Sequence, residues 1–249
     1  MSAAKDMNDL AKLILIPIGV SLMISSCGIK VKSSIDYLVS GNEYFKAGNY
    51  KLAEVEYKEA IKLDSKNATA VNNMGVIQNE LGHYAEAIET LKKAEAIDPK
   101  NVIAHYVMAN ALSRSGKPDE AIVEAKQAIT LDANEPAACR ALAEAYIAKG
   151  DAQSAIDASR QAVKLRPASE ANHLLLARSL SLNNDFDGAL NSAQKVLEID
   201  PDGVDGHLVS AQILLKAGRK DEALAEAKLA VDADSENIDA KNLLNSFKN

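Results

Sequence analysis

The chain has 249 residues, and 47% of them are hydrophobic, so there is enough apolar material to bury a core. Acidic residues outnumber basic ones, with 35 Asp and Glu against 28 Lys and Arg, which gives a formal net charge of -7 at pH 7. This balance argues against duplex nucleic acid as a partner, because neutralising phosphates requires a basic face.

Residues 1–26 have a different pattern from the rest of the chain. Lys5 and Lys12 flank a short polar start, and the apolar run LILIPIGVSLMI follows at residues 13–24. This run is shorter than the roughly 20 residues that a spanning helix needs, and it has the length of a signal-peptide core. The pattern therefore predicts a signal peptide over residues 1–26, with an uncleaved membrane anchor or a merely hydrophobic amino terminus as the alternatives.

The sequence ISSC, from Ile24 to Cys27, is similar to the lipobox of bacterial lipoproteins, in which an aliphatic residue and two small residues precede the cysteine. The resemblance implies that Cys27 is acylated, with palmitate among its chains, and becomes the first residue of the mature protein. Each buried methylene adds about 0.8 kcal/mol of membrane affinity, so two or three acyl chains would anchor the protein stably. Residues 27–33 would then form a short tether, in which Gly28 after the cysteine resembles cargo sorted to the outer membrane.

A 34-residue unit recurs six times after the tether, without insertion or deletion, at residues 34–67, 68–101, 102–135, 136–169, 170–203 and 204–237. The twentieth place of the unit is alanine in every copy and the eighth is glycine or alanine, which indicates two helices in close contact. The fifteenth place holds glycine or, once, Asn184, the residue types that best tolerate the left-handed conformation ending a helix. Each unit is therefore predicted to be two helices joined by a turn.

With this length and this spacing of small residues, the unit resembles the tetratricopeptide repeat. The resemblance implies an all-α fold, a right-handed α-solenoid of six helical hairpins in which each hairpin packs mainly on its neighbours. Residues 238–249 begin a seventh first helix and are predicted to be a capping helix. Cys139 falls at a place that packs between helices, so we expect no disulfide with Cys27.

The sequence offers no arrangement for catalysis. Three of its four histidines, His105, His173 and His207, share the fourth place of their units, but no cysteine or carboxylate set accompanies them at zinc spacing. Neither a glycine-rich phosphate loop nor a Ser/His/Asp arrangement is present. We therefore expect no enzyme activity, no catalytic residue, no cofactor and no metal site.

In this family the first helices line a concave surface through the second, fifth, ninth, twelfth and thirteenth places of each unit. The resemblance implies a peptide-binding groove whose first half includes Asn42, Phe45, Asn72, Asn79, Tyr106 and Asn110. Asparagine amides can pair with both the donors and the acceptors of an extended backbone. The alternative is an ordinary solvated polar surface. In the last two units the same places hold, among others, Arg178, Ser181, Leu182, Gln212 and Lys216.

Arg114, Arg140 and Arg178 fall on three successive units, and residues 136–169 form the only unit in which basic residues outnumber acidic ones. Guanidinium groups form bidentate pairs with carboxylates. We therefore hypothesise that this region receives an acidic side chain or the carboxyl terminus of a partner. The alternative is that Arg140 pairs with Glu144 four residues further on, a surface contact that contributes little.

Together these features predict a non-catalytic scaffold for a protein or peptide, anchored by lipid in the bacterial cell envelope. We expect an outer-membrane lipoprotein that faces the periplasm and helps to assemble an envelope complex, as pilotin-like lipoproteins do. The alternative is an adaptor or co-chaperone-like scaffold in the cytoplasm or at the inner membrane. Cleavage before Cys27 would separate the two.

Overall fold

A computed structural model of the chain describes residues 32–247, so the predicted signal peptide, Cys27 and most of the tether lie outside the described residues. The regular structure of the described part is entirely helical. It consists of six hairpins and a final helix: α3 (Ser34–Lys46) and α4 (Tyr50–Leu63), α5 (Ala68–Glu80) and α6 (Tyr84–Ile97), α7 (Val102–Arg114) and α8 (Pro118–Leu131), α9 (Pro136–Lys149) and α10 (Ala152–Leu165), α11 (Glu170–Leu182) and α12 (Phe186–Ile199), α13 (Val204–Lys216) and α14 (Lys220–Ala233), then α15 (Ile238–Ser246).

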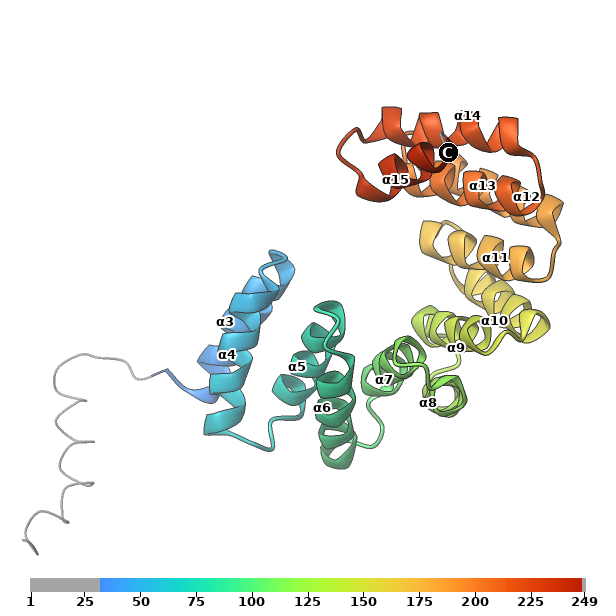
Figure 1. Cartoon of the computed structure of the whole chain (residues 1–249). Helices are drawn as coiled ribbons and strands as arrows, with labels where there is room; N and C mark the ends of the chain where they lie inside the picture. The colour runs from blue at the N-terminus through green and yellow to red at the C-terminus, as the bar shows by residue number, and fades with distance from the viewer. Residues whose placement is uncertain (1–31, 248–249) are drawn as a thin grey trace, which may run out of the picture.

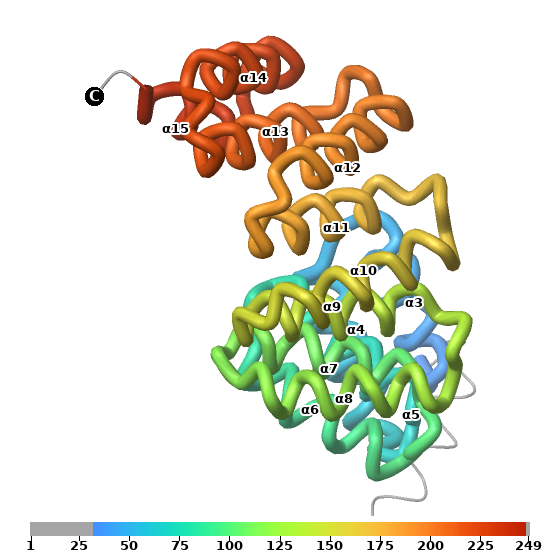
Figure 2. The backbone as a smooth tube through the Cα atoms, turned by 90° about the vertical axis from the view of Figure 1, so that its right-hand side faces the viewer, coloured from blue at the N-terminus to red at the C-terminus, as the bar shows by residue number. Residues whose placement is uncertain are grey.

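The hairpins follow one another along a curve, from α3 and α4 at one end to α14 and α15 at the other (Figure 1). The first helices α5, α7, α9 and α11 lie on the inner side of this curve, and the second helices α6, α8 and α10 lie on the outer side. Seen from the side, the same stack rises as one continuous winding chain of helices (Figure 2). The predicted all-α solenoid of helical hairpins is confirmed.

The turn inside each hairpin contains a left-handed residue. Gly48, Gly82, Gly116, Gly150 and Gly218 have φ between 73° and 81°, and Asn184 is the one other described residue with positive φ, at 61°. These are the six fifteenth places of the unit, so the prediction of a helix-ending turn there is confirmed.

Several helices begin at a side-chain cap. The oxygens of Asn67, Asn101 and Asn237 accept hydrogen bonds from backbone N–H groups in the first turns of α5, α7 and α15. Such caps satisfy donors that have no partner inside the helix. The boundary between one hairpin and the next is thus fixed locally, which keeps the stack in register.

The two helices of each hairpin meet at the eighth and twenty-fourth places, where the sizes of the two residues complement each other. In the first two hairpins a glycine faces a large side chain, Gly41 against Tyr57 and Gly75 against Leu91. In the other four hairpins an alanine takes the eighth place and alanine or serine the twenty-fourth, all of them fully buried: Ala109 with Ala125, Ala143 with Ser159, Ala177 with Ala193, and Ala211 with Ala227.

The two ends of the described stack carry different residues from its middle. The third place of the unit is fully buried in hairpins two to five, but in the first hairpin it is the partly exposed Asp36. At the other end, Ala240 of α15 is fully buried, and Leu243 packs with Leu208 and Ala230. Helix α15 therefore covers the last hairpin, as a terminal capping element does in a repeat array.

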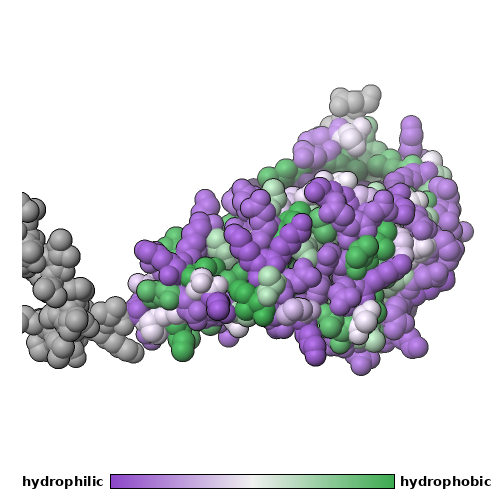
Figure 3. Space-filling model, turned by 90° about the horizontal axis from the view of Figure 1, so that it is seen from below, coloured by the Kyte–Doolittle hydropathy of each residue, from purple (hydrophilic) through white to green (hydrophobic). Residues whose placement is uncertain are grey.

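Within residues 32–247, no helix is both long enough and apolar enough to cross a membrane. Some apolar side chains on the second helices are exposed, among them Leu52, Val55 and Val123. On the face seen from below, hydrophobic groups are separated by hydrophilic ones (Figure 3). Scattered apolar residues of this kind are normal on a protein surface.

Candidate partner-binding groove

A cavity of about 370 Å³ lies across four successive first helices, α3, α5, α7 and α9. From the predicted groove set it is lined by Phe45, Asn72, Asn79, Tyr106, Asn110 and Arg140. The other lining residues are Asn73, Val76, Glu80, Ile103 and Val107. We call this space the first cavity. Asn42, Arg114 and Arg178, which were also predicted for the groove, do not line it.

Asn42 takes part in a series of linked side-chain hydrogen bonds that includes Asn72 and Asn73 of the first cavity. The Tyr57 hydroxyl donates to Asn42 Oδ1 at 2.7 Å, and Asn73 Nδ2 donates to the same oxygen at 2.9 Å. Asn72 Nδ2 in turn donates to Asn73 Oδ1 at 3.2 Å. Burial raises the pKa of Tyr57, so its hydroxyl keeps its proton and remains a donor. Asn42 therefore orients the other two asparagines.

In this series of hydrogen bonds, the side-chain oxygen of Asn72 has no donor partner. The Oδ1 atoms of Asn72, Asn79 and Asn110 are all buried, and none accepts a hydrogen bond from any described residue. Asn72 is only 4% exposed. An unsatisfied buried polar group costs about 1–3 kcal/mol, so such groups are rare in a folded protein. Three of them belong to residues that line one cavity, so a rotation of these amides would offer acceptors to a ligand that brings N–H donors.

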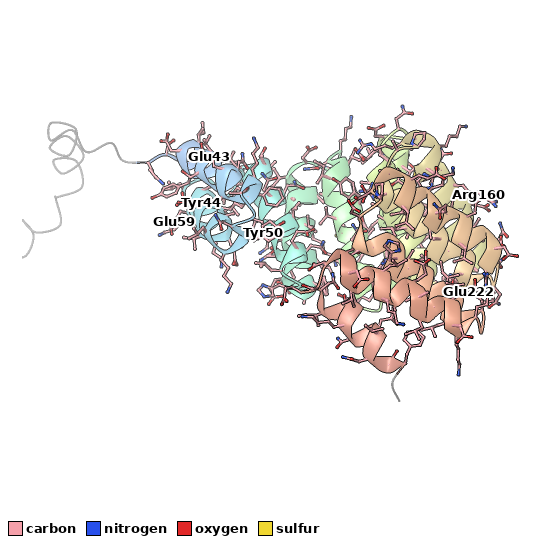
Figure 4. The ribbon with its side chains drawn as sticks, turned by 90° about the horizontal axis from the view of Figure 1, so that it is seen from above. Glu43, Tyr44, Tyr50, Glu59, Arg160 and Glu222 are labelled. Atoms are coloured by element: carbon pink, nitrogen blue, oxygen red, sulfur yellow. The ribbon has the colours of Figure 1, made fainter. Side chains whose placement is uncertain are left out.

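Aromatic and aliphatic side chains form the apolar part of the first cavity. The Phe45 ring packs against Tyr50 with ring centroids 5.6 Å apart, and Figure 4 labels Tyr50 on the first hairpin. Ile103 is 44% exposed and Val107 is buried beside it on α7. Burial raises the pKa of Tyr106, and the Glu135 charge adds to this rise while Arg140 opposes it. The Tyr106 hydroxyl is thus neutral and available as a donor or an acceptor.

Arg140 is held at the end of the first cavity by Asn172. Arg140 Nη1 donates to Asn172 Oδ1 at 3.2 Å, while Asn172 Nδ2 donates to the carbonyls of Ala162 and Arg166 at 2.7 and 3.1 Å. No nitrogen–oxygen contact within 4.0 Å joins Arg140 to Glu144, both of which lie in the described part of the chain. The alternative interpretation, an ion pair between these two residues, is therefore wrong.

Glu144 is nevertheless the acidic group on which the three arginines act. Burial raises the pKa of this half-buried carboxyl, and the charges of Arg114, Arg140 and Arg178 oppose that rise. The charges of three arginines on successive first helices thus act on one carboxylate. The Glu144 carboxylate offsets part of the positive charge that these three arginines bring to this region.

A second cavity, of about 250 Å³, lies across α9, α11 and α13. Its lining includes Arg178, Ser181, Leu182, Gln212 and Lys216, which stand at the concave places given by the resemblance, together with Ile147, Val209 and Ile213. Sequence reasoning did not single out this cavity, although Ser181 and Lys216 stand at the family's concave places. Its two cations are far apart along the chain and meet only because α11 packs on α13.

The histidines make contacts within the solenoid. His105 is buried, with Nδ1 2.8 Å from Glu124 Oε2 and Nε2 3.2 Å from the Pro99 carbonyl. His207 Nδ1 lies 2.8 Å from Glu226 Oε2, at the same places of the last hairpin. Among residues 32–247, no group of three or more His, Cys, Asp or Glu side chains could hold a metal ion. These two imidazoles link the two helices of a hairpin.

Comparison with known protein families identifies the family to which the chain belongs. A tetratricopeptide repeat model matches residues 112–178 and 180–246, and a TPR repeat model matches residues 41–82 and 77–116. The chain belongs to the tetratricopeptide repeat family, whose members act as scaffolds for protein interactions. These matches indicate no enzyme family. No curated protein sequence matches the chain.

Solved structures share the fold. The crystal structure of PilW, a widely conserved type IV pilus biogenesis factor, has a TM-score of 0.73 at 18% identity, over 85% of this chain and 98% of that chain. TTC0263, a thermophilic TPR protein of Thermus thermophilus, has a TM-score of 0.65 at 23% identity, over 72% of this chain and 97% of that chain. YrrB, a TPR protein with an unusual peptide-binding site, has a TM-score of 0.53 at 18% identity, over 78% of this chain and 98% of that chain. At these identities the likeness is one of fold.

Proposed function

We propose that the chain is a non-catalytic scaffold that binds a segment of a partner protein in the first cavity. The observation that carries this proposal is the set of three buried, unpaired oxygens of Asn72, Asn79 and Asn110 beside the Phe45 and Tyr106 rings. An extended segment has an N–H donor at each residue and alternates its side chains between two sides. Such a segment can satisfy the oxygens while placing an apolar side chain against the aromatic rings.

The partner segment carries an acidic side chain at the Arg140 end of the first cavity. Arg140 has one of its nitrogens bonded to Asn172, and a guanidinium has further N–H groups to donate. Arg114 and Arg178 add positive potential at the middle of the stack, where Glu144 offsets one charge. Paired guanidinium and carboxylate groups form stronger hydrogen bonds than neutral pairs do.

A double variant tests whether the first cavity is the binding site. Asn79→Ala with Asn110→Ala removes two of the three acceptors, and Asn191→Ala, at an exposed place on α12, is the matched control. Proteins that co-purify with the full chain from its own cells are quantified by mass spectrometry. We expect about a tenfold loss with the double variant and none with the control. Undiminished recovery with a correctly folded double variant would refute the site.

We also propose that the scaffold is a lipoprotein of the bacterial envelope, anchored through Cys27 and facing the periplasm, where it helps to assemble an envelope complex. The lipobox-like sequence supports this localisation, and the fold likeness to PilW, a pilus biogenesis factor, is compatible with it. Intact mass of the protein from the membrane fraction provides the test. We expect loss of residues 1–26 and a gain of diacylglyceryl mass, both absent in Cys27→Ala. A full-length, unmodified mass would instead favour a cytoplasmic or inner-membrane adaptor.

A further inference from the structure

The first hairpin exposes more large apolar side chains than any other hairpin does. Among the described residues, five of the eleven exposed large hydrophobic side chains lie within residues 34–67. They are, in chain order, Ile35, Val39, Leu52, Val55 and Leu63. Single exposed apolar residues are normal on a protein surface, whereas a group gathered on one hairpin is a candidate contact surface.

The three members on α4 lie on one side of that helix. Leu52, Val55 and Leu63 are separated by three and eight residues, so they form one stripe along the helix, which we call the α4 row. Ile61 comes nine residues after Leu52, on the opposite side of the helix, and packs against the core that α4 shares with α5. The α4 row therefore points away from the second hairpin, toward the free end of the stack (Figure 1).

The repeat shows that apolar residues are not required here for folding. Leu52 and Val55 stand at the nineteenth and twenty-second places of the unit, which in the second hairpin hold Glu86 and Glu89. No other unit has a large hydrophobic residue at the nineteenth place, and one other unit has such a residue at the twenty-second place, Val123. The α4 row is therefore suited to a contact outside the stack.

Charged residues border the α4 row. Glu59, labelled in Figure 4, lies between Val55 and Leu63, and Lys62 Nζ donates to its Oε2 at 3.2 Å, which offsets its charge. Lys51 and Lys62 are exposed beside the two ends of the row. Lysine side chains can reach polar headgroups while their stems cover apolar surface. This combination of apolar residues with neighbouring lysines is typical of a helix that lies at a membrane interface.

The start of the described chain is held against the first hairpin. Lys32 Nζ lies 3.2 Å from Glu56 Oε2 on α4 and 4.9 Å from the centre of the Tyr37 ring on α3. The proposed lipid anchor, Cys27, precedes Lys32 by five residues in the sequence, a distance of at most about 18 Å. The first hairpin is therefore the part of the stack that such an anchor would hold at the lipid surface.

We propose that the α4 row lies against the lipid bilayer to which Cys27 anchors the chain, so that the first hairpin makes a second membrane contact beside the acyl chains. The apolar side chains enter the boundary between headgroups and acyl chains. The stack then projects from the bilayer, with α15 at its far end, and the first cavity stays open to a partner (Figure 1). This inference rests on the proposed lipid anchor.

A single tryptophan tests the contact, because the chain has no tryptophan of its own. Val55→Trp reports on the α4 row, and Val123→Trp, at the same place of the third unit, is the matched control; the two valines are 56% and 65% exposed. The full chain from the membrane fraction is reconstituted in vesicles of phosphatidylethanolamine and phosphatidylglycerol with brominated acyl chains, which quench tryptophan on contact. We expect the Val55→Trp emission to fall by at least about half and the Val123→Trp emission to change little. Equal quenching of the two, or none of Val55→Trp, would overturn the inference.

A second reporter tests whether the α4 row itself makes the contact. Leu63→Trp should be quenched in the same vesicles. Leu52→Glu with Val55→Glu, which introduces the residues of the second hairpin, should abolish this quenching, whereas Val123→Glu should leave it unchanged. Persistent quenching in the double variant would contradict the α4 row.

Intact mass separates this inference from the proposed anchor. Acylated protein whose Val55→Trp emission is not quenched overturns only the inference, whereas an unmodified mass refutes the anchor. Quenching of unmodified protein would still support a lipid contact of the first hairpin. A Val55→Trp emission that is equally blue-shifted with and without vesicles, and insensitive to bromine, would assign the α4 row to another copy of the chain and overturn the inference.

Discussion

Asn72 and Asn172 are both buried asparagines, yet their side chains differ in how far their hydrogen bonds are satisfied. The Asn172 amide donates to two carbonyls near the end of α10 and accepts from Arg140. Asn72 donates to Asn73, and its oxygen has no partner among the described residues. Asn172 therefore stabilises the joint between α9, α10 and α11, whereas Asn72 keeps an acceptor for a ligand.

This difference predicts unequal effects on stability. Asn172→Ala leaves the Ala162 and Arg166 carbonyls without their partner, which should lower the free energy of unfolding by about 1–3 kcal/mol. Asn72→Ala removes an unsatisfied oxygen together with one hydrogen bond, so its effect should be smaller. Urea denaturation followed by circular dichroism gives both values. An Asn72→Ala cost equal to that of Asn172→Ala would contradict the difference in roles.

Glu144 predicts a pH-dependent contribution to stability. Burial raises the pKa of its carboxyl above the ordinary value of 4.5, so the folded state holds this proton more tightly than the unfolded state does. The cost of ionising Glu144 is absent below the unfolded pKa, grows as pH rises, and is complete above the folded pKa. Glu144→Gln should therefore stabilise the protein more at pH 7 than at about pH 4. A melting difference between variant and parent that is the same at both pH values would contradict this.

At the scale of the helical hairpin, the sequence repeat determines the contact between helices. Small residues at the eighth and twentieth places predicted two helices in close contact, and the fifteenth place predicted their turn. The pairing of Gly75 with Leu91, and of Ala109 with Ala125, was not predicted, because it depends on which side chains the helices bring together. The orientations of the Asn72 and Asn73 amides were also not predictable. They depend on the hydrogen bonds that link these amides to Asn42 and Tyr57.

The hairpin contact can be tested with a double-mutant cycle. A Cβ added at Gly75 would lie 2.6 Å from Leu91 Cγ. Gly75→Ala alone should therefore cost about 1–3 kcal/mol through overpacking. In a Leu91→Ala background the same change recreates the Ala109 and Ala125 pair of the next hairpin, and it should be tolerated or stabilising. Additive effects, with no coupling between the two sites, would show that these residues do not share one contact.

At the scale of the whole molecule, the stack converts a local repeat into an extended inner surface. The first cavity takes residues from α3, α5, α7 and α9, and the second takes residues from α9, α11 and α13. Concave places of the family predicted most of the first cavity, because neighbouring units supply equivalent positions. The second cavity was missed because the net charge of the last two units is negative, whereas the local lining is positive.

Photo-crosslinking in cells tests most directly whether the partner binds on the concave inner surface. A benzophenone amino acid replaces Tyr106 in the first cavity or Val123, which is 65% exposed on the outer helix α8. We expect a defined crosslinked species from Tyr106 that disappears with Asn79→Ala and Asn110→Ala, and no such species from Val123. The same species from Val123, or its persistence in the double variant, would contradict binding in the concave groove.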